Sequence, residues 1–278
     1  MRPLGRLAVA IALGSCSVAT LSAQWPEVRT KMPLTPSGAP DLSAAAPKLA
    51  DGRTPDLSGI WDAEKRPCNE ATAALGCIDA QQGIPPGAVN VAGANNELPM
   101  QPWAQAAVKE RTANGAKDFP FSRCLPISPA NSWASFTLLK VVQTSDTLVV
   151  LDEYMLQYRQ IFLDGRRLPD NAEPMFKGYS VGKWEGDTLV VETTGLKDGA
   201  WLDVRGHPLT DQARITERIR RVDYGHLQVD TTIDDPKAYT KPWSATTRLS
   251  LATNTELLEY ICNENEKSLQ HMVGADVK

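Results

Sequence analysis

Apolar and polar residues alternate along several short stretches in the second half of the chain. The clearest example is 178–196, GYSVGKWEGDTLVVETTGL, in which two strand-like runs flank the turn Glu185-Gly186-Asp187. The second run, 188–194, is rich in β-branched residues, which suit a pleated, half-buried surface. We therefore predict a β-hairpin here, and the same pattern recurs on both sides of it.

Further strand-like runs are joined mostly by short polar turns and do not alternate with helical patterns. They occupy 136–144, 147–154, 158–163, 214–223, 226–234, 243–252 and 256–263. About nine short strands joined in this way indicate a mainly β protein with an antiparallel meander rather than an α/β fold. Because closure removes exposed strand edges, we predict an up-and-down, lipocalin-like β-barrel, with a two-sheet sandwich as the alternative.

The chain begins with a short basic stretch and an apolar run, which together are typical of an export signal. Cleavage is expected after Ala23, with Ala19 as an alternative, while Leu13-Gly-Ser-Cys16 resembles a lipobox whose cysteine would be lipidated. The apolar run is shorter than the roughly 20 residues that a membrane span needs. We therefore expect a protein exported to the periplasm or the extracellular space, with no transmembrane span after signal removal.

Changes in composition divide the chain into four parts. Prolines crowd the segment after the signal and exclude a helix or a central strand there. Ordered structure is expected to begin at 55–61, PDLSGIW, with a short first strand that turns Trp61 inward, and the chain from there to 132 is irregular apart from one short helix. The parts are a signal peptide at 1–23, a proline-rich arm at 24–56, an irregular segment at 57–132 that packs on the barrel, and the barrel domain at 133–278.

Net charge and cysteine spacing narrow the function classes. The formal net charge is −4 and no basic run is interleaved with aromatic residues, which argues against a nucleic-acid binder. Outside the signal, Cys68 and Cys77 lie close together in a predicted loop and are expected to pair, which leaves Cys124 to pair with Cys262. No CxxC or HExxH motif occurs, so neither a metal site nor a cofactor is predicted.

One carboxylate is predicted inside the barrel. Strand alternation places Glu217 on the same face as Ile215 and Ile219, toward the interior. Burying it without a partner would be costly, so a partner is implied, and Arg159 and Arg221 are the candidates. The group belongs either to a structural ion pair at the end of the barrel or to a ligand-binding or catalytic site.

A second candidate is the loop segment 201–207, WLDVRGH, which we expect at the mouth of the barrel. A carboxylate and an imidazole on one loop, Asp203 and His207, could perform general acid–base catalysis. The alternative is that His207 is a solvated surface histidine without a catalytic role.

Aromatic and polar residues near the predicted strand ends are candidates for contact with a small ligand. These candidates are Arg159, Tyr179, Trp184, Trp201, Trp243 and Asn263. Asn263 directly follows Cys262 and could present its amide at the barrel rim, or it could simply end a strand that a disulfide fixes.

Several longer motifs resemble a known protein family. PDLSGIW, RQIFLDGR, GYSVGKWEGDTLVVETTGL, ERIRR, TIDDPKAYTKPW and ELLEYICNENEK together resemble a large family of exported, mostly uncharacterised bacterial proteins that are abundant in acidobacteria. The resemblance runs from about Pro55 to His271 and implies an exported, β-rich protein, but no established activity. Many relatives have a second histidine where this chain has Leu209, so a histidine pair is not implied here.

Three functions fit these patterns. We prefer an exported β-barrel that binds a small, partly apolar ligand in its interior. A cofactor-independent isomerase, lyase or hydrolase is the alternative, with Glu217, Asp203 and His207 as catalytic residues and Arg159 as an anion anchor. A third possibility is an interaction subunit of an envelope complex, which would bind a protein partner and use the proline-rich arm as a tether.

Overall fold

The computed structural model describes residues 32–64, 91, 98–135, 137–203, 205–262 and 264. Two α-helices occur among them, α2 (Pro102–Ala113) and α3 (Pro129–Trp133), with the 3₁₀-helices η2 (Pro120–Arg123) and η3 (Tyr154–Leu156). The strands are β1 (Gly59–Ala63), β2 (Leu139–Gln143), β3 (Thr147–Asp152), β4 (Gln157–Phe162), β5 (Tyr179–Glu185), β6 (Thr188–Thr194), β7 (Ala200–Trp201), β8 (Pro208–Leu209), β9 (Arg214–Arg221), β10 (His226–Asp234) and β11 (Trp243–Leu251).

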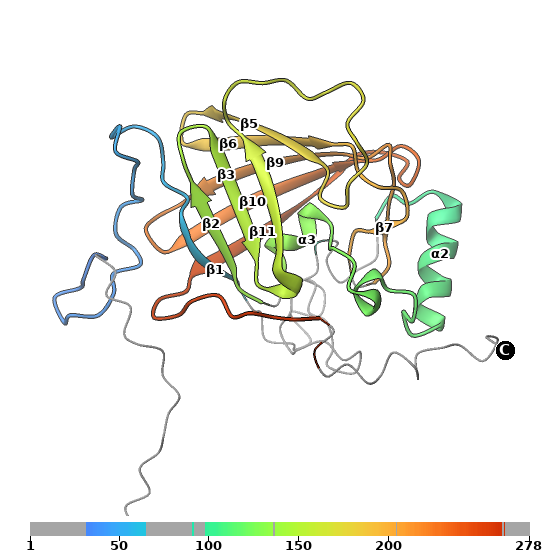
Figure 1. Cartoon of the computed structure of the whole chain (residues 1–278), viewed down its shortest axis with the longest axis horizontal. Helices are drawn as coiled ribbons and strands as arrows, with labels where there is room; N and C mark the ends of the chain where they lie inside the picture. Colours follow the sequence, from blue (N-terminus) through green and yellow to red (C-terminus); the bar gives the residue numbers. More distant parts are fainter. Residues whose placement is uncertain are drawn as a thin grey trace, which may run out of the picture.

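Nine of these strands close into one barrel (Figure 1). Their order around the barrel is β1-β11-β10-β9-β6-β5-β4-β3-β2, and β7 and β8 form a separate two-stranded ladder. The central hairpin predicted from the sequence is β5–β6, and β3, β4, β9 and β10 also lie where alternation places them. The prediction of a mainly β, closed barrel is therefore confirmed.

The barrel departs from a pure antiparallel meander at one seam. Strands β4 and β5 run parallel, whereas every other neighbouring pair is antiparallel. A closed ring with an odd number of strands cannot alternate in direction all the way round, so nine strands require at least one parallel pair. Parallel neighbours need a crossover connection, and the segment 163–178 provides it (Figure 1).

The predicted strand 256–263 is wrong, because the described residues after β11 contain no further strand. The position beside β11 is taken by β1, whose Trp61 lies opposite Leu251 in the antiparallel ladder. β1 also pairs with β2 and so closes the barrel. The short first strand predicted around Trp61 is therefore present as β1, and it belongs to the barrel although most of the segment 57–132 was expected to be irregular.

A short helix that alternation did not predict enters one end of the barrel. α3 begins at Pro129, and the Ser128 side chain caps it by accepting a hydrogen bond from the Asn131 backbone nitrogen at 3.1 Å. All five of its residues are buried, and Trp133 packs within the core of the barrel. Five residues are too few to show a helical period, so the sequence pattern could not reveal this helix.

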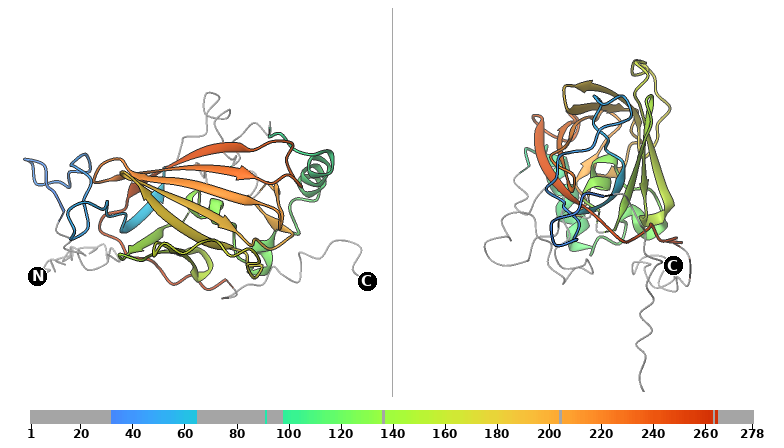
Figure 2. Two further views of the ribbon diagram at one scale, coloured as in Figure 1. Left: turned by 90° about the horizontal axis from the view of Figure 1, so that it is seen from above. Right: turned by 90° about the vertical axis from the view of Figure 1, so that its left-hand side faces the viewer.

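The two ends of the barrel differ. α2 lies at one end, and the N-terminal arm lies at the other, as Figure 2 shows. The arm packs on the turn between β9 and β10, where the Tyr224 and Gly225 backbone nitrogens donate to the carbonyls of Ala44 and Leu42. A second apolar cluster fills the α2 end and includes Ala104, Val108 and other side chains from α2, β8, β9 and β10. The α2 end is therefore closed by packed side chains.

The predicted disulfide between Cys124 and Cys262 is confirmed, with an S–S distance of 2.06 Å. It ties the segment before α3 to the segment after β11. The predicted partners Cys68 and Cys77 lie outside the described residues, as do Cys16 and the signal peptide. None of the helices among the described residues is long and apolar enough to cross a membrane.

Candidate functional site

The predicted interior carboxylate is paired with one of its two candidate arginines. The Arg159 guanidinium donates from Nη1 to Glu217 Oε1 at 3.0 Å and from Nη2 to Oε2 at 2.5 Å, which makes a bidentate ion pair. Both residues are almost fully buried, with exposed fractions of 0% for Glu217 and 2% for Arg159. The other candidate, Arg221, donates to the carbonyls of Asp56, Ser58 and Tyr224 instead.

Polar side chains complete the surroundings of this ion pair. Trp133 Nε1 donates to Glu217 Oε1 at 2.6 Å, so α3 is bonded directly to the barrel interior. Arg159 also donates to Ser180 Oγ at 3.0 Å and to Thr193 Oγ1 at 2.8 Å. Every charged atom of the pair thus has a hydrogen-bond partner, as a buried ion pair requires.

A second buried ion pair lies near the first. Lys177 Nζ donates to Asp152 Oδ2 at 2.8 Å and to Ser132 Oγ at 2.5 Å. Burial lowers the pKa of Lys177, while the Asp152 carboxylate opposes this shift and the Arg159 charge adds to it. Lysine and serine with a carboxylate can form a nucleophilic site, but Ser132 is 0% exposed and therefore out of reach of a substrate.

Two polar atoms next to this pair are buried without a partner among the described residues. They are Asp152 Oδ1, an acceptor, and Gln157 Nε2, a donor. The two residues lie directly opposite each other in the β3–β4 ladder. A water molecule bridging the two atoms would satisfy both of them.

The structure buries both candidate acid–base residues of the loop 201–207. The His207 Nδ1 and Asp203 Oδ2 atoms are 2.6 Å apart, and both side chains are fully enclosed. Asp203 Oδ1 also accepts from the backbone nitrogens of Arg205 and His207. The expectation of a solvated surface histidine is wrong, because His207 is 0% exposed.

The two predicted catalytic groups are not joined. No hydrogen bond or ion pair within the described ranges links the Asp203–His207 pair to Glu217. The His207 Nε2 atom is buried and has no partner among those residues. The geometry therefore supplies two separate buried pairs rather than one convergent acid–base site.

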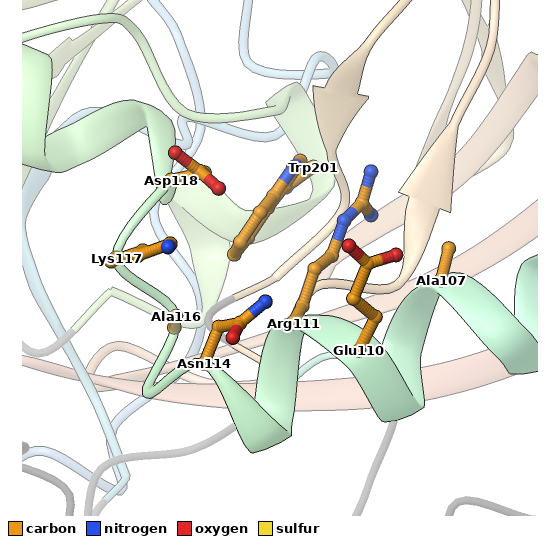
Figure 3. A pocket seen from close by; sticks show the side chains of 8 residues that line it. All are labelled: Ala107, Glu110, Arg111, Asn114, Ala116, Lys117, Asp118 and Trp201. Carbon is orange, nitrogen blue, oxygen red and sulfur yellow. The ribbon is translucent and has the colours of Figure 1, made fainter. Parts of the chain in front are cut away.

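A cavity of about 260 Å³ opens beside this loop, between the C-terminal turns of α2 and Trp201 (Figure 3). Trp201, a predicted ligand residue, forms one wall of the cavity. The Arg111 guanidinium carbon lies 4.5 Å from the centroid of the Trp201 ring, and Arg111 Nη1 donates to the Gly206 carbonyl. Burial lowers the pKa of Arg111, but the guanidinium remains charged at neutral pH, as arginine does throughout proteins. The lining residues are Ala107, Glu110, Arg111, Asn114, Ala116, Lys117, Asp118 and Trp201.

The remaining candidate ligand residues are not brought together. Trp184 packs against the barrel core near the β5–β6 turn, and the Tyr179 ring stacks on Phe162 outside the barrel. Trp243 packs edge-to-face on Tyr239 at the α2 end, with 5.6 Å between ring centroids. Asn263 lies outside the described residues.

Sequence reasoning missed several residues of these clusters. Asp152 lies on a strand, where its inward alternation could have been noticed, but Lys177 lies in a loop without any period. Arg111 lies in the last turn of α2 and Lys117 in the turn that follows the helix, and only the fold reveals that Trp201 faces them. No group of three or more His, Cys, Asp or Glu side chains in the described part of the chain is arranged to hold a metal ion.

Comparison with known proteins adds no relative. A scan against protein-family models finds no match, and a search of curated proteins finds no matching chain. A functional proposal therefore depends on the geometry of this chain.

Proposed function

We propose that the protein is an exported β-barrel that binds a small, partly apolar ligand, and that it does so in the cavity between α2 and Trp201. The cavity carries this proposal. Its volume of about 260 Å³ is slightly below the usual range for drug-sized ligands, so the ligand is small. Its lining combines one aromatic wall and two alanines with five polar or charged side chains, which suits a ligand that is only partly apolar.

The barrel interior is a less suitable place for the ligand that the sequence suggested. Trp61 and Trp133 are both buried in the interior together with aliphatic side chains from most of the strands. A ligand there would have to displace Trp133 and break its bond to Glu217. Binding at the α2 end requires no such rearrangement.

Binding is also better supported than catalysis. An acid–base catalyst must come within hydrogen-bond reach of its substrate, and both Asp203 and His207 are fully enclosed. Glu217 is held by Arg159 and Trp133, so its carboxylate is already satisfied. We therefore interpret both pairs as structural supports of the barrel and of its α2 end.

Export is supported by the cysteine chemistry. The Cys124–Cys262 disulfide connects residues 138 positions apart in sequence, and such bonds persist mainly in oxidising compartments. The basic and apolar start of the chain agrees with this, and cell fractionation of the native protein would test it.

A fragment screen with a blocked cavity tests the binding proposal. Saturation-transfer NMR is run on the wild type, on Ala107→Trp, which fills the cavity, and on Ala106→Trp as a control. Ala106 is an exposed neighbour on α2 that does not line the cavity. Fragments should bind the wild type and Ala106→Trp but not Ala107→Trp. Equal binding to all three proteins would place the ligand elsewhere, and no binding at all would refute the proposed function.

A further inference from the structure

We infer that the ligand of this cavity carries a carboxylate group and that Arg111 binds it. The inference rests on the proposed function, because it assigns a chemical class to the ligand of the same site. Arg111 and Lys117 are the two cations of the cavity lining, and only Nη1 of the Arg111 guanidinium is hydrogen-bonded to another described residue.

The Arg111 guanidinium is fixed in place before any ligand arrives. It lies over the Trp201 ring, and Nη1 is bonded to the Gly206 carbonyl. Gly206 has a φ of +82°, and an added Cβ there would lie 2.7 Å from Arg111 Cδ. Only glycine allows this close approach, so the loop and the arginine fit each other. A fixed guanidinium loses little conformational entropy when it binds an anion.

The loop that presents the Gly206 carbonyl is itself rigid. The Leu202 backbone nitrogen donates to the His207 carbonyl at 2.8 Å, which closes the loop, and the Gly206 nitrogen donates to the Asp203 carbonyl at 3.1 Å. The buried Asp203–His207 pair lies inside this loop. The pair therefore holds in position the carbonyl that orients Arg111.

Three side chains that line the cavity have N–H donors without a partner among the described residues. Apart from Nη1, the N–H groups of Arg111 form no hydrogen bond with other described residues, and neither do the side chains of Asn114 and Lys117. Figure 3 shows the Asn114 and Lys117 nitrogen atoms pointing toward the space beside Trp201. A planar fork with two further donors matches a carboxylate, which accepts hydrogen bonds at both oxygens.

Three carboxylates oppose this arrangement, those of Glu110 and Asp118 in the lining and that of the buried Asp203. Glu110 and Asp118 are both exposed, and the Asp118 carboxylate is 3.5 Å from the Arg123 guanidinium. Exposed charges are screened by water and salt, whereas Arg111 is half-buried, where the effective dielectric constant is lower. Because these carboxylates offset part of the Arg111 charge, the hydrogen-bonding fork of the arginine rather than a net positive field would select a carboxylate.

The rest of the lining describes the body of the ligand. Trp201 supplies an aromatic wall, and Ala107 and Ala116 leave room on the other sides. Arg111 lies over the Trp201 ring and Phe119 packs on it with 5.2 Å between ring centroids, so only a small part of Trp201 is left for a ligand to touch. A small aromatic carboxylate, with its ring beside that part of Trp201 and its carboxylate on Arg111, fits these features. Benzoate is the simplest probe of this class.

Calorimetric titration of the full chain with three matched probes tests the inference. Benzoate, benzamide and benzylamine share one ring and differ in charge. We expect benzoate to bind at least about tenfold more tightly than the other two, since hydrogen bonds to a charged group are worth that much. Arg111→Gln should remove this advantage, so that benzoate and benzamide bind with similar affinities.

Two controls keep the outcome interpretable. Lys109→Gln removes the same charge from an exposed position on α2 outside the cavity and should change no affinity. Arg111→Lys keeps the charge but loses the fork, so it should weaken benzoate binding even if Arg111→Gln folds poorly. Equal affinities for benzoate and benzamide would overturn the carboxylate inference while the proposed function stands. If no probe binds but the fragment screen yields cavity ligands, hits without a carboxylate also overturn it. If that screen yields none, the proposed function itself fails.

Discussion

Removing one charge of the interior ion pair should destabilise the barrel strongly. In Glu217→Gln the side chain keeps its shape, but the fully buried Arg159 guanidinium loses its counter-charge. Breaking a buried pair in this way costs about 3–5 kcal/mol of folding free energy, because an uncompensated charge remains in a low-dielectric interior. The remaining bonds of Arg159 Nε to Ser180 and of Nη2 to Thr193 supply no negative charge.

Replacing both partners should be much less harmful. In the double variant Arg159→Met with Glu217→Leu neither charge of this pair is left buried without its partner, and such replacements are often neutral or stabilising. The Ser180 and Thr193 hydroxyls, which are 2.9 Å apart, can still bond to each other. Only Trp133 Nε1 loses its acceptor, which costs about 1–3 kcal/mol. The double variant should therefore be more stable than Glu217→Gln.

Urea unfolding followed by circular dichroism measures both effects as shifts of the midpoint at constant slope. Arg218→Gln is the matched control. Arg218 lies on the same strand, β9, as Glu217, and the substitution breaks its exposed ion pair with Glu185 of β5. That variant should lose at most about 1 kcal/mol. A similarly small loss in Glu217→Gln would refute the reasoning, since the interior pair would then behave as if it were solvated.

Three further predictions concern the disulfide and the α2 end. Cys124→Ser opens a long covalent loop to Cys262 and should cost about 4–5 kcal/mol, measured by urea unfolding with the reduced wild type as a control. His207→Ala removes the side-chain partner of the buried Asp203 and should cost about 1–3 kcal/mol, seen as a lower Tm; an unchanged Tm would contradict the enclosed pair. Burial raises the pKa of Tyr239 well above its ordinary value of 10.0, so the folded state keeps this proton when the unfolded chain has released it. The associated stability is complete below pH 10 and falls as the pH rises further, and Tyr239→Phe should weaken that fall in pH-dependent unfolding.

Strand alternation was sufficient to predict the barrel and the inward position of Glu217. A period of two is a strong signal in long hairpins, and the cost of burying a carboxylate correctly implied an arginine partner such as Arg159. The same reasoning could not reach Lys177 or Trp133. Neither lies on a strand, and their positions depend on how a loop and a five-residue helix pack against the barrel.

The candidate site was less accessible to prediction than the fold. Trp201 was singled out as an aromatic residue, but the wall that it forms exists only because α2 packs beside it. Asp203 and His207 were recognised as a pair on one loop, yet their burial depends on distant segments. Loops lack a hydrophobic period, so their exposure cannot be predicted from local sequence.

The seam between β4 and β5 gives the interior arginine a mechanical role. Only two positions pair across this parallel seam, Ile161 with Ser180 and Phe162 with Val181, so its backbone ladder is the shortest of the barrel. Arg159 starts from β4, bonds to Ser180 on β5 and reaches on across the barrel to Glu217 on β9. Inside the barrel, the Arg159 side chain thus links the two strands that share the fewest backbone pairs. When Arg159 is replaced, amide hydrogen exchange along β5 should quicken well before exchange in the hairpins on the opposite wall of the barrel does.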